Sequence, residues 1–368
     1  MRHLFETTWI KGLQLPNRFV RSATWEGMAT PKGAVSPKLV ETMIRLARGG
    51  VGLIITGHAY VRPEGQASPF QLGIHQDDLV HGLQEMTQAV HAQGGKIVLQ
   101  LSHAGRFAWR EGIGRPPLVV SGDGSSSSPV EELTKPAIQE LVQAFAEAAR
   151  RAKTAGFDGI QIHSAHGYLL NQFLSPAFNR RQDEYGGDLR NRVRVHLEIC
   201  EALRKVVGED YPILIKLNGR DFIENGLSLE ESVQIGKILA RGGIDAIELS
   251  GGMIIAGKFS PSRQGIDSRE KEAYFQEEAK VMRGEVGIPL ILVGGIRSFE
   301  VAEKLLQDGV ADYISMSRPL IRDPDLILRW KRGERHRSAC RSDNLCFKPG
   351  REGEGVYCVV RAKEEGAS

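Results

Sequence analysis

Residues 136–163 read PAIQELVQAFAEAARRAKTAGFDGIQIH, and this stretch contains the unit from which the fold is built. Pro136 suits the first turn of a helix, apolar residues recur at helical spacing up to Ala155, and Gly156 is a typical helix stop. The short run Gly159–His163 follows and has the length and the branched apolar residues of a strand. The stretch therefore predicts a helix that leads directly into a strand.

Short apolar runs alternate with longer amphipathic segments along almost the whole chain. The eight predicted strands are Phe19–Ser22, Gly52–Thr56, Lys96–Leu101, Gly159–His163, Ile213–Leu217, Ala246–Ser250, Leu290–Val293 and Tyr313–Met316. The eight predicted helices are Pro37–Arg48, Asp77–Gln93, Pro136–Ala155, Leu189–Val207, Leu229–Arg241, Arg269–Val286, Ser298–Gln307 and Asp325–Lys331. Eight such units without a break in composition favour an α/β fold of the closed TIM (β/α)8 barrel type. An open doubly wound sheet would need a G-x-G-x-x-G stretch after its first strand, and the sequence has none there.

The two ends of the chain are predicted to add to the barrel. We expect Leu4–Leu15 to form a small hairpin that closes the bottom of the barrel. We divide the chain into a barrel domain, residues 1–335, and a C-terminal tail, residues 336–368, which holds three of the four cysteines. The loop after the third strand runs for about 35 residues and includes Ser125–Ser128, and we expect it to form part of the barrel mouth.

The composition is that of a globular protein, and it excludes several kinds of partner. Lys and Arg total 48 against 45 Asp and Glu, a formal charge of +3, and they are interspersed, so no basic stripe predicts nucleic-acid binding. No apolar run approaches the roughly 18 residues of a membrane helix, and Met1–Gly12 lacks the apolar centre of a signal peptide. We expect a cytoplasmic protein without a membrane partner, and the sequence leaves both a monomer and a homo-oligomer open.

In a TIM barrel the chemistry lies at the carboxyl ends of the strands, so the residues that follow each strand are the candidates for a site. The polar strand-end residues include Thr24, His58, Gln100, His103, Arg106, Lys216 and Ser250. Two further strand ends read Val293-Gly294-Gly295-Ile296 and Met316-Ser317-Arg318-Pro319. Bare backbone N–H groups and one guanidinium at neighbouring strand ends predict a phosphate site made by Gly294, Gly295, Ser317 and Arg318.

His163, His166 and Tyr168 lie within six positions at the end of the fourth strand. Zinc would need a third protein ligand, and no acidic or cysteine residue follows at a suitable spacing. Two neutral imidazoles can each donate an N–H to a carbonyl oxygen that becomes negative, which is the action of an oxyanion hole. The Tyr168 phenol stays protonated at neutral pH and can act as a general acid. We therefore expect the three residues to be catalytic and the two histidines to bind substrate.

Lys216 ends the fifth strand inside an apolar run and has two functional interpretations. It could form a Schiff base with a carbonyl substrate, or supply a fixed positive charge beside a developing anion. The local sequence does not choose between them. Gln100, at the end of the third strand, carries an amide that suits the edge of a planar heterocycle.

Three consecutive stretches carry a family resemblance: AGFDGIQIH at 155–163, AHGYLLNQFLSP at 165–176 and NRRQDEYGG at 179–187. They resemble the signature region of the Old Yellow Enzyme family of FMN-dependent ene-reductases. The resemblance extends to NRF at 17–19, QLSHAGR at 100–106, VGGI at 293–296 and SRPL at 317–320, so it covers essentially the whole chain. The most similar subgroup comprises the bacterial NADH:flavin oxidoreductases and the barrel domain of 2,4-dienoyl-CoA reductase.

The resemblance implies an FMN site, NADH or NADPH as the hydride donor, and a reaction. The flavin ring would contact Ala23, Thr24, Gln100 and Lys216, and its phosphate would lie on Gly294, Gly295, Ser317 and Arg318. The enzyme would reduce the C=C bond of α,β-unsaturated carbonyl compounds, with His163 and His166 on the carbonyl oxygen and Tyr168 as the proton donor. Alternatives on the same scaffold are reduction of a dienoyl thioester and amine dehydrogenation or demethylation. Two alternatives do not follow from the resemblance: a barrel enzyme that forms a Schiff base, and a flavin carrier without catalytic activity.

The sequence departs from the family's pattern at two positions. The family usually has arginine where Lys216 stands, so the positive charge is kept and the planar fork is lost. Relatives with an iron–sulfur cluster carry four cysteines, whereas this chain has Cys340, Cys346 and Cys358 with Asp343 at the second position. Three thiolates and one carboxylate make an incomplete iron–sulfur motif, and we expect no cluster there. A three-cysteine zinc site is the weaker alternative.

Overall fold

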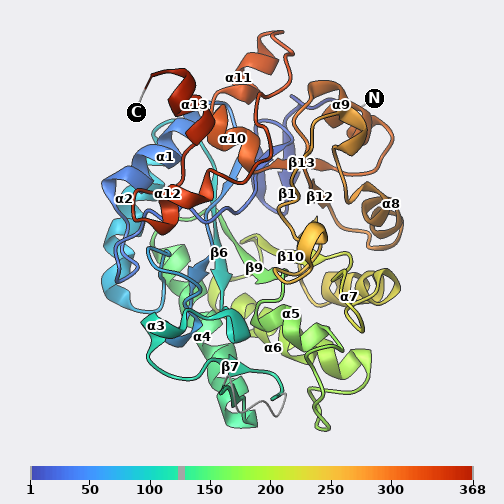
Figure 1. Cartoon of the computed structure of the whole chain (residues 1–368). Coiled ribbons are helices and arrows are strands. Elements are labelled where there is room, and N and C mark those ends of the chain that lie inside the picture. The colour runs from blue at the N-terminus through green and yellow to red at the C-terminus, as the bar shows by residue number, and fades with distance from the viewer. Residues whose placement is uncertain (1, 123–128, 367–368) are drawn as a thin grey trace.

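The computed structural model describes residues 2–122 and 129–366, and in it parallel strands close into a barrel surrounded by helices (Figure 1). The eight barrel strands are β3 (Phe19–Arg21), β4 (Leu53–Ile55), β6 (Ile97–Ser102), β9 (Gly159–Ser164), β10 (Ile213–Asn218), β11 (Ala246–Ser250), β12 (Leu290–Val293) and β13 (Tyr313–Met316). Neighbours pair in the order β4-β3-β13-β12-β11-β10-β9-β6, and β6 returns to β4, which closes the ring. The predicted TIM barrel and its eight strands are confirmed.

The outer helices match the predicted positions with one exception. They are α1 (Pro37–Arg48), α2 (Val80–His91), α4 (Lys135–Thr154), α6 (Leu189–Val207), α7 (Leu229–Arg241), α8 (Gln276–Glu285), α9 (Phe299–Gln307) and α11 (Leu326–Lys331). The predicted helix over 269–286 is wrong in its first half, because Ala273 has a left-handed φ of 52° and α8 starts only at Gln276. The Glu272 carboxylate explains the break, since it accepts hydrogen bonds from the backbone N–H groups of Arg297 and Ser298 and so ties this segment to the start of α9.

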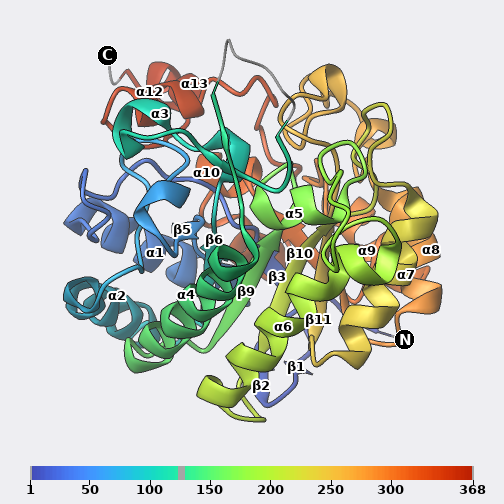
Figure 2. The ribbon, with the colours of Figure 1, turned by 90° about the horizontal axis from the view of Figure 1, so that it is seen from below.

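A hairpin closes the bottom of the barrel, as predicted. Its antiparallel strands are β1 (Thr8–Ile10) and β2 (Leu13–Leu15). Ile10, Leu13 and Leu15 pack against the inward-facing apolar residues of the barrel strands, which include Val20, Leu53, Ile55, Val98, Leu214 and Ile291. Figure 2 shows this hairpin at one end of the barrel and the last two helices, α12 (Phe347–Arg351) and α13 (Val359–Glu364), at the other.

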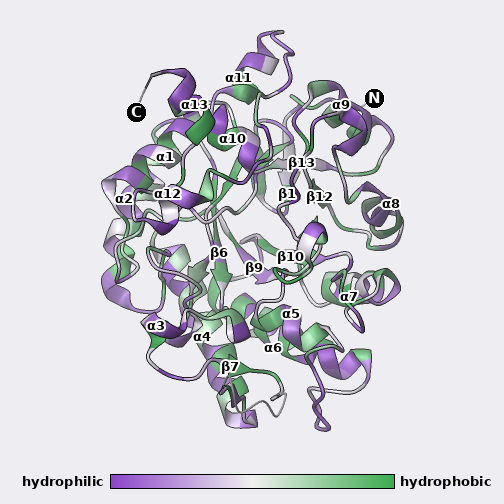
Figure 3. Cartoon of the chain, in the orientation of Figure 1, coloured by the Kyte–Doolittle hydropathy of each residue, from purple (hydrophilic) through white to green (hydrophobic). Residues whose placement is uncertain are grey.

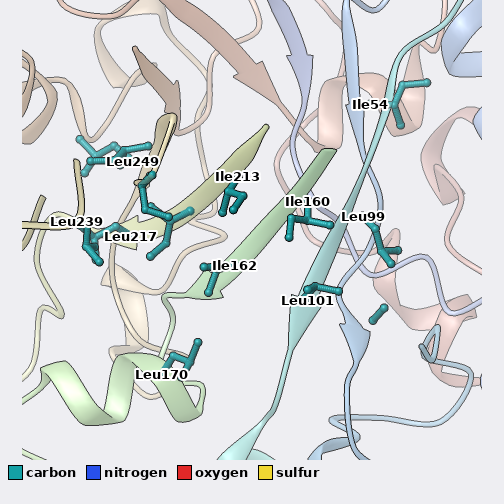
Figure 4. Close-up of a cluster of buried hydrophobic side chains, with 14 of the residues drawn as sticks. Ile54, Leu99, Leu101, Ile160, Ile162, Leu170, Ile213, Leu217, Leu239 and Leu249 are labelled. Atoms are coloured by element: carbon teal, nitrogen blue, oxygen red, sulfur yellow. The ribbon is translucent and has the colours of Figure 1, made fainter. Parts of the chain in front are cut away.

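The main core lies between the barrel and its helices. Alternate strand residues such as Leu99, Leu101, Ile160 and Ile162 point outward into this layer, where they are fully buried (Figure 4). Hydropathy follows the same division, with hydrophobic residues along the central strands and mixed residues on the surrounding helices (Figure 3). None of the helices in the described ranges is long and apolar enough to cross a membrane.

Short elements fill the loops at the carboxyl ends of the strands. They are β5 (Ala59–Tyr60), α3 (Arg110–Ile113), β7 (Leu118–Val119), β8 (Glu131–Glu132), α5 (Leu169–Leu174) and α10 (Arg318–Arg322). The tail folds back over this end: Ser338 donates its N–H to the Arg297 carbonyl at 3.0 Å, and the Arg297 side chain donates to the Cys340 carbonyl. The tail is therefore placed to form part of whatever site lies there.

Candidate active site

A cavity of about 600 Å³ opens at the carboxyl ends of the barrel strands. The strand ends contribute Ala23, Thr24, Trp25, His58, Gln100, His163, His166, Tyr168, Lys216 and Ser317 to its lining. The segment 254–264 after β11 and the tail residues 343–351 supply the rest of the wall. The barrel thus brings together candidate residues that are nearly 300 positions apart in the sequence, from Ala23 to Ser317.

The expectation that the loop after β6 forms part of the barrel mouth is met by none of the described residues of this loop. No described residue of this loop lines the cavity, and Ser125–Ser128 lie outside the described residues. His103 and Arg106, two strand-end candidates, also lie away from the cavity. The His103 Nδ1 atom accepts the Gly105 N–H at 3.1 Å, so this histidine is a structural part of the turn.

His163, His166 and Tyr168 meet because β9 ends in a tight turn that leads into α5. The His163 ring centroid lies 5.2 Å from that of His166 and 4.7 Å from that of Tyr168. His166 has a left-handed φ of 65°, a conformation that costs about 1–3 kcal/mol and persists only where its surroundings hold it. Here the His166 N–H donates to Asn218 Oδ1 at 3.2 Å, and its carbonyl accepts the Ile254 N–H at 3.2 Å.

Both imidazoles are neutral, and His166 Nε2 lies 2.8 Å from Ser250 Oγ. Burial lowers the pKa of His163 and of His166 well below the usual range, and the nearby Lys216 ammonium lowers both further. The Ala165 N–H donates to His163 Nδ1 at 3.3 Å, which leaves the ring proton of His163 on Nε2. Burial also raises the pKa of the Tyr168 phenol, so this group is fully protonated at neutral pH. The arrangement can therefore bind a carbonyl oxygen and deliver a proton beside it.

Polar side chains that reach one another across the strands form the floor of the cavity. Gln100 Nε2 donates to Gln161 Oε1 at 2.6 Å, and Gln161 Nε2 donates to Glu248 Oε2 at 2.8 Å. Lys216 Nζ donates to Ser22 Oγ at 2.9 Å and forms an ion pair with Glu248. All five side chains are buried, so the network holds Gln100 and Lys216 in fixed positions.

The predicted phosphate side begins with two glycines directly after β12. Gly295 has a φ of +75°, and a Cβ added to it would lie 2.7 Å from a ring carbon of Tyr274. Only glycine fits there. Gly294 has a φ of +146°, a conformation that L side chains rarely adopt.

Ser317 and Arg318 follow β13, the neighbouring strand. Ser317 Oγ lies 2.7 Å from Thr24 Oγ1, which joins this strand end to the polar floor. The Arg318 guanidinium donates to Asn344 Oδ1 of the tail at 2.7 Å. Ser317 lines the cavity, whereas Gly294, Gly295 and Arg318 lie beside it and not in its lining.

Several cavity residues have no role in the sequence analysis. His58 appears there only as a strand-end residue, while Trp25 and the tail residues Leu345 and Lys348 do not appear at all. Trp25 and His58 each follow a barrel strand closely, and this position in the sequence could have identified them as site candidates. The tail residues carried no signal, because their place depends on how the tail folds back.

The three tail cysteines lie close to one another beside the main cavity, and none of them lines it. Cys340, Cys346 and Cys358 line a small space of about 10 Å³ together with Asp343 and Arg318. Burial raises the pKa of the Cys346 thiol to about 12. In the described ranges, no group of three or more His, Cys, Asp or Glu side chains is placed to hold a metal ion.

Comparison with known proteins agrees with this geometry. The sequence profile of the NADH:flavin oxidoreductase / NADH oxidase family matches residues 3–337. The chain belongs to this family. Membership implies FMN as the cofactor and a nicotinamide as the hydride donor. The resemblance to the Old Yellow Enzyme family is confirmed.

Relatives of two lengths share the family's barrel with this chain. The NADH oxidase of Thermoanaerobacter brockii is 40% identical over 341 residues, which are 91% of this chain and 51% of that protein. The metal reductase of Desulforamulus reducens is 36% identical over 99% of this chain and 54% of its own length. The chain thus spans about half the length of these two relatives. The NADPH dehydrogenase of Bacillus licheniformis is 38% identical over 88% of this chain and 92% of its own length.

Solved structures show the same fold. A complex of 2-naphthoyl-CoA reductase with 2-naphthoyl-CoA has a TM-score of 0.90 at 28% identity, over 97% of this chain and 56% of that one. An Old Yellow Enzyme homologue from Zymomonas mobilis has a TM-score of 0.78 at 28% identity, over 93% of this chain and 96% of that one.

The residues of this family member fit FMN. The bare backbone at Gly294 and Gly295 and the guanidinium of Arg318 are the donors that a phosphate monoester needs. Gln100 and Lys216 present an amide and an ammonium group at the cavity floor, which suits the polar edge of the flavin ring.

Proposed function

We propose that this chain takes hydride from NADH or NADPH onto FMN and reduces the C=C bond of α,β-unsaturated carbonyl compounds. The observation that carries the proposal is the set His163, His166 and Tyr168, in which two neutral imidazoles and one protonated phenol line the same cavity. FMN supplies the hydride chemistry when bound, and the protein residues supply orientation and the proton.

The two histidines activate the substrate and Tyr168 completes the reaction. His163 and His166 donate to the carbonyl oxygen, which draws electron density from the conjugated bond and makes the β-carbon electrophilic. When hydride adds to the β-carbon, negative charge gathers on the oxygen between the two imidazoles. Tyr168 then gives its proton to the α-carbon. The alkene gains one hydride and one proton, the nicotinamide is oxidised, and Tyr168 regains a proton from solvent.

The cofactor contacts follow the same assignment. We propose that Ala23, Thr24, Gln100 and Lys216 contact the flavin ring, and that Gly294, Gly295, Ser317 and Arg318 hold its phosphate. The alternative role of Lys216 as a Schiff-base nucleophile needs a free amine. Its nitrogen is instead engaged with Glu248 and Ser22, which favours the role of a fixed charge.

A second candidate is reduction of an unsaturated acyl thioester that carries phosphate groups. The observation that favours it is the basic side of α12, where Lys348 and Arg351 line the cavity wall. Exposed apolar side chains of Ile254 and Leu345 also line the cavity and could cover an acyl chain. The two candidates share the same hydride and proton transfer and differ in the part of the substrate outside the cavity.

Rapid-mixing kinetics of the two half-reactions test the proposal. The flavin is reduced anaerobically with NADH or NADPH, and its reoxidation is followed after mixing with a cyclic enone, a linear enal or an unsaturated acyl-CoA. We expect Tyr168→Phe to slow reoxidation by about 100-fold or more and to leave reduction unchanged. Tyr357→Phe, on the surface of the tail, is the control and should change neither step. Unchanged reoxidation in Tyr168→Phe would refute the assigned proton donor.

A further inference from the structure

The Tyr168 hydroxyl has one hydrogen-bond partner in the described part of the chain, and this partner is a histidine. Tyr168 Oη lies 3.4 Å from Nε2 of His58, which comes three residues after the end of β4. The two rings meet edge to face, with centroids 5.4 Å apart and an interplanar angle of 87°. Because the proton on Tyr168 is the one that the proposed reaction transfers, the role of His58 depends on which of the two groups donates.

The buried side chain of Gln71 decides this question. The Ala67 backbone N–H can only donate, and it lies 2.6 Å from one end of the Gln71 amide, so that end is the oxygen. The other end is the NH2 group, and the His58 carbonyl, which can only accept, lies 3.0 Å from it. The same NH2 group lies 2.6 Å from His58 Nδ1. Two backbone groups thus orient the amide so that its nitrogen donates to Nδ1.

The protonation of His58 follows from this contact. Burial lowers the pKa of His58 to about 4, so the ring carries a single proton at neutral pH. Nδ1 accepts from Gln71 and therefore has no proton, so the proton is on Nε2. Nε2 faces the Tyr168 oxygen. His58 is thus the donor of this pair, and Tyr168 is the acceptor.

We propose that His58, oriented by Gln71, is a positioning residue for proton transfer from Tyr168. A phenol oxygen that accepts from His58 Nε2–H keeps its own O–H free to point toward the substrate. After the proton has left, the same N–H donates to the phenolate and stabilises it. The opposite tautomer would do the reverse, because an unprotonated Nε2 would accept the Tyr168 proton and hold it away from the substrate. This inference rests on the proposed function of Tyr168 and adds the group that sets its orientation.

Nitrogen-15 NMR of the FMN-loaded enzyme, labelled in histidine, tests the tautomer without using activity. We expect the His58 ring to show a protonated Nε2 and an unprotonated Nδ1 at pH 7, with His58→Gln identifying the signals. In Gln71→Glu a carboxylate oxygen replaces the NH2 group, and the proton should then be found on Nδ1. A proton on Nδ1 of His58 in the unaltered enzyme would overturn the proposal.

Half-reaction kinetics test the role itself. We expect His58→Leu to slow reoxidation by an enone by between about 10-fold and 100-fold and to leave reduction by the nicotinamide unchanged. His58→Gln keeps an N–H donor and should recover most of the lost rate. In a Tyr168→Phe background, His58→Leu should have no further effect. A slow Tyr168→Phe beside an unaffected His58→Leu would refute this inference alone, whereas an unaffected Tyr168→Phe would refute the proposed function.

Discussion

The Lys216 ammonium lies 3.1 Å from the Glu248 carboxylate, and both side chains are almost completely buried inside the barrel. The two residues are direct partners in the parallel pairing of β10 and β11. Glu248 also accepts hydrogen bonds from Ser22, Gln161 and Ser315. Burial alone would raise the pKa of the Glu248 carboxyl, but Lys216 and these hydrogen bonds outweigh it and hold the pKa below its usual value. The cavity floor therefore carries a compensated ion pair and not a lone cation.

This pair predicts a large loss of stability when only one partner is removed. Lys216→Met leaves Glu248 buried without a counter-charge, and we expect the free energy of unfolding to fall by about 3–5 kcal/mol. The double variant Lys216→Met with Glu248→Gln should recover most of the loss, because neither position then carries a charge. Urea unfolding measures the free energy of unfolding of the single and the double variant. It is done on FMN-free and on FMN-saturated protein, because bound FMN adds its own stabilisation. Equal losses in the single and double variants would show that the ion pair is not the cause.

Buried histidines predict a loss of stability in mild acid. Burial lowers the pKa of His58 and of His103 to about 4 and that of His196 to about 3, and lowers those of His163 and His166 as well. Between these values and the ordinary value near 6.5, the unfolded chain binds more protons than the folded one, so the free energy of unfolding falls as the pH falls. Each histidine adds up to about 1.4 kcal/mol per pH unit within this window.

Urea titrations at several values between pH 7 and pH 4.5 check this slope. His196, whose Nε2 lies 2.7 Å from Ser164 Oγ, is buried but does not line the cavity, so His196→Asn is a suitable comparison. We expect the free energy of unfolding of the variant to depend less steeply on pH, by up to about 1.4 kcal/mol per pH unit, which corresponds to one proton. A stability that is flat between pH 6.5 and pH 4.5 would contradict the neutral, buried state of these histidines.

The sequence predicts those parts of the structure that depend on local patterns. Helix and strand positions follow from periodicity, and His163, His166 and Tyr168 are found because they are neighbours in the chain. Glu248 stands in the apolar run of β11, but its contact with Lys216 depends on the register between two strands, which no local pattern reveals. The role of His58 likewise depends on partners 13 and 110 positions away.

The described walls of the cavity mouth come from segments that the sequence analysis does not assign to it. It expects the loop after β6 to form part of the mouth, whereas the described walls beyond the strand ends come from residues 254–264 and 343–351. Two contacts between these segments hold them together: Asn344 Nδ2 donates to the Ser262 carbonyl at 2.8 Å, and Gln264 Nε2 donates to the Asp343 carbonyl at 3.0 Å. Such long-range contacts between loops leave no periodic signal in the sequence.

The oxyanion hole predicts the effect of removing a single histidine. His163→Ala or His166→Ala removes one N–H donor to the carbonyl oxygen, and we expect the second-order rate constant of reoxidation to fall by about 10²–10³-fold. Asparagine at either position keeps an amide donor and should recover part of the rate. The reductive half-reaction serves as the internal control for folding and FMN content. Full activity in both alanine variants would exclude these histidines from carbonyl binding.

Arg318 predicts a difference between two flavins. Its side chain is buried and its guanidinium donates to Asn344 Oδ1. If it also holds the phosphate, we expect Arg318→Ala to weaken FMN binding by about 10-fold to 100-fold, because a charge-assisted hydrogen bond is lost. Riboflavin has the same ring and no phosphate, so its affinity should hardly change. Flavin fluorescence titrations of flavin-free protein compare the two ligands. Equal weakening of FMN and riboflavin would place the phosphate elsewhere.

The tail cysteines predict that a single substitution can create an iron–sulfur site. Cys340, Cys346 and Cys358 surround a space of about 10 Å³ together with Asp343, and a space of that size holds about one water molecule. We expect the unaltered protein, purified without oxygen, to contain far less than one equivalent of iron. If the fourth thiolate is the only ligand that the tail lacks, Asp343→Cys should bind a cluster after anaerobic reconstitution, because four thiolates are the usual ligands.

Iron and sulfide analysis with visible absorption checks both proteins, and Asp343→Ser is the matched control. Stoichiometric iron in the unaltered protein would show that the carboxylate serves as a ligand, whereas an iron-free Asp343→Cys would show that the tail has lost more of the site than one residue.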